Sequence, residues 1–372
     1  MTFRKTIFWL HLVAGLTAGT VIAIMCLTGA ALSFENEIVN WAERDARQVA
    51  LPAAGAPRLA LRELLENVRA TEPDARPTGI TVSSNPNDAV IFSFGRDRAL
   101  YANPYTGDVK APASTRVHDF LSVLETWHRW LALGDDHRAI GKAVSGACNL
   151  AFCLLAITGL YLWWPRSWSW RGVKGVLFFD WKLRGKARDF NWHNVTGLWS
   201  APILILLTLT AIPMSYRWGT NLIYQLVGEA PPAPSAPGAG TPTVTVPAPA
   251  TGARRDGDTP RPRENRGGTT RPPASAVTVT VKQPHTWPRT ATTTLLLNPY
   301  TGEILSHEGY ADLSTGRQIR SWTRFLHTGQ ALGTIGQLVA GLACLGGCLL
   351  VYTGFALAWR RFLGRKKIPA ST

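Results

Sequence analysis

Four long apolar stretches constrain the fold of this chain more than any other feature. They cover residues 7–34, 140–164, 194–216 and 334–359. Each is long enough to cross a hydrocarbon core of about 30 Å as a helix. A bilayer offers the backbone no water, so a spanning segment of this kind must form its hydrogen bonds internally. The sequence therefore predicts a membrane α-helical fold, a four-span helical bundle, with the remaining residues outside the bilayer.

The distribution of charge predicts the orientation of the bundle. The net charge of +15 would suggest nucleic-acid binding if it were spread over a soluble domain. Residues 1–6, 165–193 and 360–372 instead contain 14 basic and two acidic residues, a net charge of +12 in three short segments beside helix ends. Short loops rich in Lys and Arg stay in the cytoplasm. We therefore expect both termini inside, no nucleic-acid partner, and the two long segments outside.

The first span could be read as a signal peptide, because a basic start is followed by an apolar run and small residues. The run is longer than the 7–15 residues of a signal core, and it carries His11 near its start. We therefore expect an uncleaved helix. The five cysteines all fall within the spans, so the external segments are expected to lack disulfides. No Cys-x-x-Cys-His sequence occurs, which excludes the usual covalent attachment of c-type haem.

The segments between the spans predict two small external modules. Residues 56–116 contain an amphipathic helix at 58–71 and strands at 79–84, 89–94 and 98–102, which is typical of a small α+β module. Residues 275–312 resemble a truncated copy with strands at 275–282 and 290–297. Residues 117–139 predict a helix that leads into the second span. The remaining segments are a tryptophan-rich basic loop (165–193), a disordered Pro/Gly/Arg-rich linker (229–274) and a basic tail (360–372).

An internal duplication links these parts. The pentapeptide Asn-Pro-Tyr-Thr-Gly occurs at residues 103–107 and again at 298–302. Downstream of each copy stands a histidine, His128 or His327, followed four to six positions later by Ala-Leu-Gly and then by an apolar run. Each run ends with Thr-Gly and a tryptophan-rich basic sequence. Such matched segments indicate a repeated unit of external module, histidine and membrane helix.

Four histidines stand at the predicted ends of the four spans. His11 and His193 lie at the inner ends of the first and third spans, and His128 and His327 precede the outer ends of the second and fourth. Histidine at a membrane span is a functional candidate. Two per face is the number that two bis-histidine haems need, because haem iron takes axial imidazoles and bundle cores hold cofactors. The alternative is that these histidines lie at the membrane interface and hydrogen-bond only to backbone groups or lipid headgroups.

His137 competes with His128 as the outer ligand, since it lies closer to the second span. The repeat favours His128, because residues 132–134 match residues 331–333 while the sequence around His137 has no counterpart. The other histidines, His118, His285 and His307, fall in external segments and are expected to be solvated. No nucleotide-binding glycine motif and no His-Glu-x-x-His occurs, so flavin or nicotinamide would have to come from a partner.

The histidine pattern, the Thr-Gly-Leu-Tyr-Leu-Trp-Trp-Pro-Arg sequence at 158–166 and the segment 191–197 resemble the PepSY-associated transmembrane helix family. The two pentapeptide modules resemble PepSY domains, and the likeness covers nearly the whole chain except residues 229–274. Members include iron-regulated bacterial inner-membrane proteins and di-haem ferric-siderophore reductases. The resemblance implies two non-covalent haem b groups at His11, His193, His128 and His327, and reduction of ferric chelates on the periplasmic face.

The sequence thus predicts a multi-pass protein of the bacterial inner membrane that passes electrons from a cytoplasmic or membrane donor to a periplasmic ferric siderophore or other ferric chelate. Reduction would release the metal, because siderophores hold iron(III) far more tightly than iron(II). The alternative prediction is a PepSY binding or inhibitory module that is tethered to the membrane by plain helices and has no redox activity.

Overall fold

The computed structural model describes residues 2–52, 56–73, 77, 79–83, 85–95, 98–112, 115–164, 169–233, 245–246, 274–281, 287–288, 291–298, 301 and 303–363. The chain divides into two compact units. A helical unit comprises residues 1–45, 112–231 and 314–372, and a sheet unit comprises residues 46–111 and 232–313. Most of the predicted linker and the end of the predicted tail lie outside the described residues.

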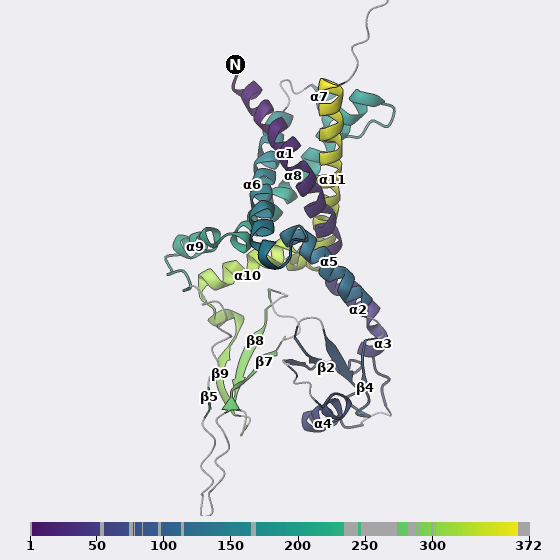
Figure 1. Ribbon diagram of the computed structural model, residues 1–372, viewed down its shortest axis with the longest axis vertical. Helices are drawn as coiled ribbons and strands as arrows, with labels where there is room; N and C mark the ends of the chain where they lie inside the picture. Colours follow the sequence, from purple (N-terminus) through teal and green to yellow (C-terminus); the bar gives the residue numbers. More distant parts are fainter. Residues whose placement is uncertain are drawn as a thin grey trace, which may run out of the picture. The chain divides into compact units, whose positions relative to one another are not determined.

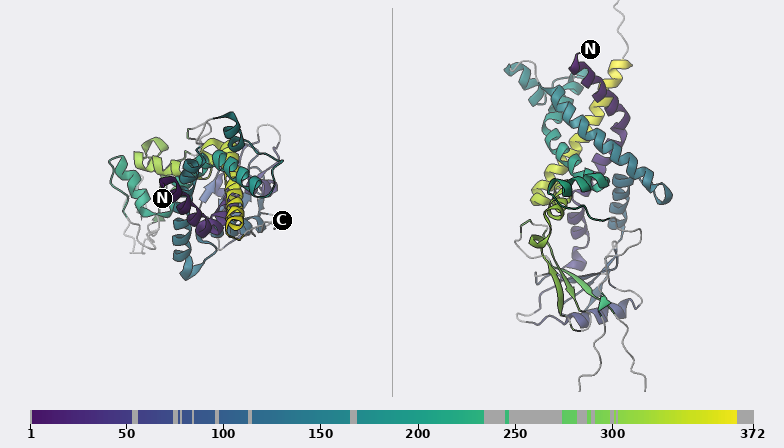
Figure 2. Two further views of the ribbon diagram at one scale, coloured as in Figure 1. Left: turned by 90° about the horizontal axis from the view of Figure 1, so that it is seen from above. Right: turned by 90° about the vertical axis from the view of Figure 1, so that its left-hand side faces the viewer.

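The helical unit is built on the four predicted membrane helices. They are α1 (Phe3–Leu32), α6 (Arg138–Trp163), α8 (Gly185–Ser215) and α11 (Gly333–Phe362). Each is long and apolar enough to cross a membrane. Helix α1 packs against α6 and α11, and α8 packs against the same two helices, so the four form a closed ring (Figures 1 and 2). The predicted four-span bundle is therefore confirmed.

Small and polar side chains let these helices approach closely. A Cβ added at Gly347 of α11 would lie 2.5 Å from the Cys26 sulfur of α1, so only glycine fits there. In the same interior, the Asn149 amide donates to the Thr208 carbonyl at 3.0 Å and joins α6 to α8. In lipid, helices associate through such close packing and polar contacts rather than through the hydrophobic effect. Helix α8 continues through Pro202 and Pro213, as bundle packing allows.

Shorter helices surround the two ends of the bundle. They are α2 (Glu35–Ala42), α5 (Arg116–Trp130), α7 (Trp170–Leu177), α9 (Arg217–Leu226) and α10 (Thr315–His327), with 3-10 turns at Asp135–His137 and Gln330–Leu332. Helix α3 (Arg44–Arg47) crosses the boundary between the two units, and a 3-10 turn at Tyr310–Asp312 belongs to the sheet unit. Helices α5, α9 and α10 lie at one end of the bundle, and the N-terminus lies at the other (Figure 1). The sequence predicted α5 but did not predict α9 or α10.

The order of helices repeats along the chain. The first half runs α1, α2, α5, α6, and the second half runs α8, α9, α10, α11. In both halves a span is followed by a short helix, then by residues of the sheet unit, and then by a histidine-bearing helix that leads into the next span. The duplication predicted from the pentapeptides therefore extends to the architecture of the helical unit.

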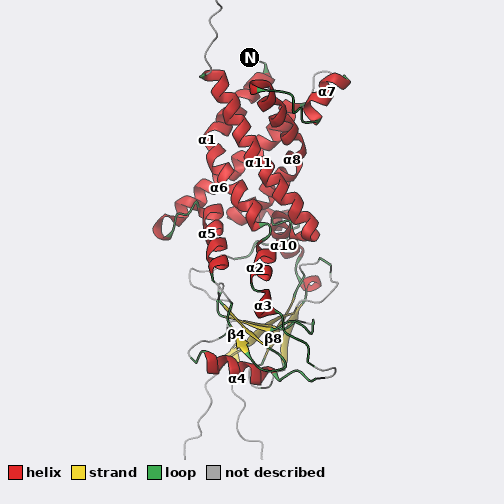
Figure 3. Cartoon of the chain, turned by 90° about the vertical axis from the view of Figure 1, so that its right-hand side faces the viewer, coloured by secondary structure: helices red, strands yellow, loops and turns green. Residues whose placement is uncertain are grey.

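The sheet unit contains every strand of the described residues (Figure 3). Its first part is an antiparallel sheet in the order β1 (Gly79–Thr81), β2 (Val90–Ser93), β3 (Ala99–Ala102) and β4 (Val109–Lys110). Helix α4 (Leu61–Thr71) contributes Leu64 and Val68 to a core with Phe92 and Leu100, which are paired across β2 and β3. This is the predicted α+β module, with a shorter β1 and with β4 as an additional strand.

The second part of the sheet unit is a meander of β7 (Val277–Val281), β8 (Thr293–Leu297) and β9 (Ile304–Glu308). The sequence predicted the first two strands and missed β9. Two short strands, β5 (Thr245–Val246) and β6 (Ala274–Ser275), pair with each other where the sequence predicted a structureless linker. No α-helix lies among the described residues of this second part.

Candidate functional site

The structure brings the four predicted histidines together as two pairs. His128 at the end of α5 faces His327, the last residue of α10, with ring centres 6.2 Å apart and ring planes inclined by 53°. His11 of α1 and His193 of α8 form the second pair and interact electrostatically with each other. All four side chains are partly buried. Each pair takes one histidine from each half of the chain.

The His11–His193 pair is held by two threonines in equivalent positions. The His11 Nδ1 lies 2.9 Å from the Thr158 hydroxyl of α6, and the His193 Nδ1 lies 2.9 Å from the Thr353 hydroxyl of α11. Each threonine belongs to the duplicated Thr-Gly sequence at the end of a span. The same contact is therefore made twice, once in each half of the bundle.

The His128–His327 pair is held mainly by backbone carbonyls. The His128 Nδ1 lies 3.0 Å from the Met25 carbonyl of α1, and the Thr28 hydroxyl is also 3.0 Å away. The His327 Nδ1 lies 2.9 Å from the Leu207 carbonyl of α8. Met25 and Leu207 are themselves equivalent, because each follows its helix's own histidine by 14 positions.

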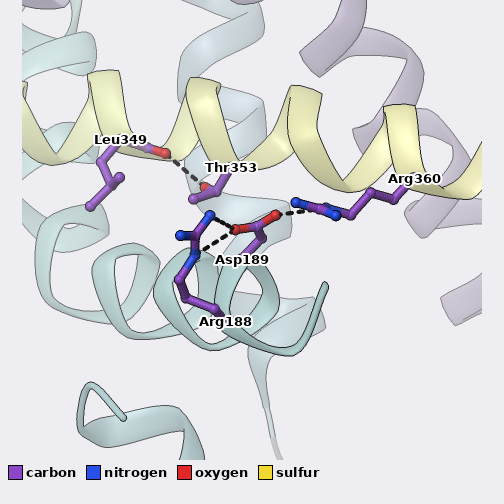
Figure 4. A network of polar contacts seen from close by, with 5 residues as sticks. All are labelled: Arg188, Asp189, Leu349, Thr353 and Arg360. Atoms are coloured by element: carbon purple, nitrogen blue, oxygen red, sulfur yellow. Dashed lines mark hydrogen bonds and ion pairs between the residues drawn. The ribbon is translucent and has the colours of Figure 1, made fainter. Parts of the chain in front are cut away.

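These contacts determine which ring nitrogen carries the proton. A carbonyl oxygen can only accept, so the Nδ1 atoms of His128 and His327 must donate. The Thr158 and Thr353 hydroxyls already donate to the Leu154 and Leu349 carbonyls at 2.7 Å, so they accept from the imidazoles. Figure 4 shows this bond for Thr353. Each neutral ring therefore leaves a bare lone pair on Nε2, and within the described chain no hydrogen bond reaches those four atoms.

Burial keeps the His128–His327 pair neutral. Burial lowers the pKa of the His128 imidazole to about 4, and the neighbouring His327 adds to this effect. Burial likewise lowers the pKa of His327. A neutral imidazole presents a lone pair, which is the form that binds a metal. At neutral pH this pair can therefore act as a pair of ligands and is not a pair of cations.

Two buried polar atoms without partners flank His193. They are the indole Nε1 of Trp192 and the hydroxyl of Thr196, and they are the two such side-chain atoms found in the described part of the chain. Buried donors are rarely left unpaired, and an exception marks a bound group or a water that would satisfy it. Thr196 follows His193 by three positions and so lies on the same face of α8. The surroundings of His193 therefore have unused capacity to bind a polar group.

A buried carboxylate fixes the end of α8 near His193. Asp189 accepts hydrogen bonds from its neighbour Arg188 at 2.8 and 3.0 Å and from Arg360 of α11 at 2.9 Å (Figure 4). Its side chain is 1% exposed, whereas both arginines remain partly open to solvent. This contact joins α8 to the helix that carries Thr353. It has no counterpart in the first half, where Ile7 occupies the equivalent position four residues before His11.

The helices that carry His128 and His327 are each fastened near their starts by a carboxylate. The buried Glu43, which follows α2, lies 2.6 Å from the His118 Nε2 of α5. Glu229, which follows α9, accepts from the Ser314 hydroxyl at 2.7 Å and from the Gly316 amide at the start of α10. The Ser314 hydrogen bond holds the pKa of Glu229 below its ordinary value. Sequence reasoning had placed Glu229 in a disordered linker and His118 in solvent.

The remaining candidates stand apart from the pairs. His137 is exposed at the end of a 3-10 turn, and His307 is an exposed partner of Asp312 at 3.7 Å. His285 and residues 165–168 of the tryptophan-rich loop lie outside the described residues. Within the described ranges, no group of three or more His, Cys, Asp or Glu side chains is placed to hold a metal ion. The available donor sets are the two histidine pairs, which suit a group needing two axial ligands.

The fold and site define a multi-span helical membrane protein with paired histidines at two levels of one bundle. More specifically, the chain belongs to the PepSY-associated TM region family, whose sequence profile matches residues 8–361. No curated protein matches the sequence. The predicted family is thereby confirmed over nearly the whole chain.

Proposed function

We propose that this protein is an electron carrier of the bacterial inner membrane that holds two haem b groups and reduces periplasmic ferric chelates, including ferric siderophores. The proposal is carried by one observation, the two pairs of histidines that share one protonation pattern. His11 and His193 would hold one haem, and His128 and His327 would hold the other. Family membership supports a role of this kind without specifying it.

The spacing within the His128–His327 pair suits this group. An imidazole nitrogen binds a transition metal at about 2 Å, so one metal between two imidazoles needs ring centres about 6 Å apart. The two rings are 6.2 Å apart. The four free Nε2 atoms of His11, His193, His128 and His327 would supply two nitrogen ligands at each level. The unpartnered Thr196 hydroxyl and Trp192 indole add polar capacity beside His193.

The residues of the chain have three tasks in this function. The hydroxyls and carbonyls at Nδ1 orient the imidazoles and increase the basicity of Nε2. The surrounding helices exclude water and set the dielectric. Haem would supply one-electron chemistry when bound, and the protein would tune its potential through the histidine ligands, the hydrogen bonds at their Nδ1 atoms and burial. Two redox stations at opposite ends of a bundle that spans the bilayer would allow electrons to cross it.

The orientation belongs to the proposal as well. The basic segments at both termini and in the loop before α8 place these parts in the cytoplasm by the positive-inside rule. Reporter fusions at Lys174 and after Thr372 should then be active on the cytoplasmic side, and a fusion at Asn87 on the periplasmic side. A cytoplasmic signal at Asn87 would reverse the proposed direction of electron flow. The donor would be a cytoplasmic or membrane reductant.

The deciding experiment is a dithionite-reduced minus oxidised absorbance spectrum of protein purified after expression with ample haem. Two bound haems per chain, with the spectrum of bis-histidine haem b, are expected. A ferric siderophore added to the reduced protein should then be reduced, which a ferrous-specific chelator would report. Protein without a Soret band would contradict the proposal and favour the second candidate, a membrane-tethered binding or inhibitory module. That candidate is supported by the separate sheet unit.

A further inference from the structure

Three of the four paired histidines rest against a Thr-Gly dipeptide of a spanning helix, and His327 is the exception because its Nδ1 meets the Leu207 carbonyl. Four such dipeptides occur in the four spanning helices, at Thr28, Thr158, Thr196 and Thr353 with the glycine that follows each. Three of them lie under a histidine. Thr158 lies under His11, Thr353 under His193 and Thr28 under His128, with oxygen to Nδ1 distances of 2.9, 2.9 and 3.0 Å.

The glycine provides room for the ring that the threonine holds. A Cβ at Gly159 would lie 3.4 Å from the His11 Cε1, and one at Gly354 would lie 3.7 Å from the His193 Cε1. At Gly29 the same atom would lie only 3.1 Å from the His128 Cε1. The imidazole thus packs over the small residue while its Nδ1 reaches the adjacent hydroxyl. The threonine hydroxyl and the space left by the glycine act on the same ring because the two residues are consecutive on one helix.

The hydroxyl acts as an acceptor because its own proton is engaged. Thr28, Thr158 and Thr353 each donate to the carbonyl four residues earlier, at 2.7 Å. Only the oxygen lone pairs then remain for the imidazole, so the ring must donate from Nδ1. Thr196 is the contrasting case, because its hydroxyl has no partner and Gly197 faces Leu350. The dipeptide sequence is therefore not sufficient, and what defines the arrangement is the back-bonded hydroxyl beneath a ring.

We propose that Thr158-Gly159 and Thr353-Gly354 each hold one imidazole ring, and we call each of these dipeptides an imidazole seat. In each seat the threonine is a positioning residue that fixes the tautomer of the histidine it contacts, His11 or His193, and tunes the electron density at its Nε2. This inference rests on the proposed function for its redox consequence, whereas the fixing of the tautomer does not depend on it. A hydrogen-bond acceptor at Nδ1, the ring nitrogen that does not bind the metal, increases the basicity of Nε2, the nitrogen that does. A more basic ligand favours ferric over ferrous iron, so the seat lowers the potential of the haem it serves.

The His11–His193 pair is where this can be tested, because each Nδ1 has a threonine hydroxyl as an acceptor, with a backbone contact to Leu350 in addition at His193. Thr158→Val and Thr353→Val keep the shape of the side chain and remove the acceptor. Thr158→Ser and Thr353→Ser restore it. Thr208→Val is a matched control, since Thr208 is a buried threonine of α8 that donates to its own helix and contacts no histidine nitrogen. His128 and His327 retain carbonyl acceptors in all these variants and provide an internal reference.

The first measurement is a redox titration that resolves the two haems. Each valine variant should keep both haems and shift the midpoint potential of the His11–His193 haem to a more positive value, with the larger shift in the double variant. The serine variants and Thr208→Val should match the wild type. Unchanged potentials in the double valine variant would overturn the proposal. So would an equal shift in the serine variants, because that would indicate packing alone.

The second measurement requires no haem. Histidine nitrogen NMR of haem-free protein in detergent micelles should show His11 and His193 in the neutral form with the proton on Nδ1. The double valine variant should lose this preference, whereas the serine variants should keep it. A proton on Nε2 in the wild type would overturn the seat. A wild type that shows the Nδ1 form but binds no haem when haem is supplied would contradict the proposed function and leave the seat standing.

Discussion

The two histidine pairs use the same ring chemistry with different supports. His11 and His193 belong to spanning helices and give their Nδ1 protons to side-chain hydroxyls. His128 and His327 belong to short helices at the bundle's end and give theirs to carbonyls of α1 and α8. A hydroxyl can be removed by one substitution, but a carbonyl cannot. The hydroxyl acceptors of the first pair can therefore be changed by substitution. The carbonyl acceptors of the second pair depend instead on how α5 and α10 are placed against α1 and α8.

The largest expected effect is the loss of one haem when one histidine of a pair is removed. His193→Ala should remove the His11–His193 haem and leave about half of the Soret absorbance, because the variant lacks one of the two imidazoles that would hold that haem. His128→Ala should remove the other half. Haem quantified per chain, together with the split of midpoint potentials, identifies which haem is lost. His137→Ala is the control and should retain both haems. Bleaching of the His128–His327 haem by the control alone would show that the repeat misidentified the ligand.

A second prediction compares the space around the two pairs. Gly29→Ala would place a Cβ 3.1 Å from the His128 Cε1, which is closer than ordinary contact. We expect partial loss of the His128–His327 haem, because small shifts at a ligand propagate through a close-packed interior. Gly354→Ala would place its Cβ 3.7 Å from the His193 Cε1, an ordinary contact, and should leave both haems in place. Equal haem losses in the two variants would remove this distinction between the pairs.

A third prediction concerns the ion network found only in the second half of the chain. Asp189→Asn keeps the shape of a side chain that is 1% exposed and removes the charge facing Arg188 and Arg360. Hydrogen bonds to a charged group contribute about 1.5–3 kcal/mol, and the partial exposure of both arginines places the expected loss at the lower end. Thermal unfolding in detergent should show it as a lower midpoint. Ile7→Val, at the equivalent place in the first half, is the control and should change it little.

The smallest expected effect is at the start of α10. Glu229→Gln should loosen the helix that carries His327 and slightly lower occupancy of the His128–His327 haem, leaving the other haem unchanged. Because the pKa of Glu229 is lowered in the folded protein, its contribution is complete above the ordinary carboxyl range and is lost as pH falls through the folded pKa. Haem retention in wild type and variant should therefore converge in acid. A difference that persists at acidic pH would contradict this role of the carboxylate.

The sequence was sufficient to predict the parts of the molecule set by composition and spacing. The four spans follow from apolar length, α5 follows from the segment ahead of the second span, and the repeat favours His128 over His137. The structure places His128 beside His327 and leaves His137 exposed. That these residues bind haem remains a prediction.

Other features depended on information that a single sequence does not carry. The Met25 and Leu207 carbonyls are backbone atoms, and residue identity says nothing of whether a neighbouring ring will reach them. Helix rotation within the bundle decides that Thr158 and Thr353 lie under histidines while Thr196 does not. Glu229 was assigned to the linker because its surroundings are rich in Pro and Gly, and only tertiary contact reveals its bond to Ser314. The recurring Thr-Gly was the one signal that could have indicated the seats.

The pairing of histidines from different halves of the chain has a consequence for a half-length ancestor and for a protein cut into two fragments. Each histidine pair draws one ring from α1 or α5 and the other from α8 or α10. Helix α1 contacts both α6 and α11, and α8 contacts the same two. A half-length chain would carry one ring of each pair and would complete both only as an isologous, two-fold symmetric dimer. Two fragments joined only by association should therefore complement each other, whereas either fragment as a monomer would be unable to close a single site.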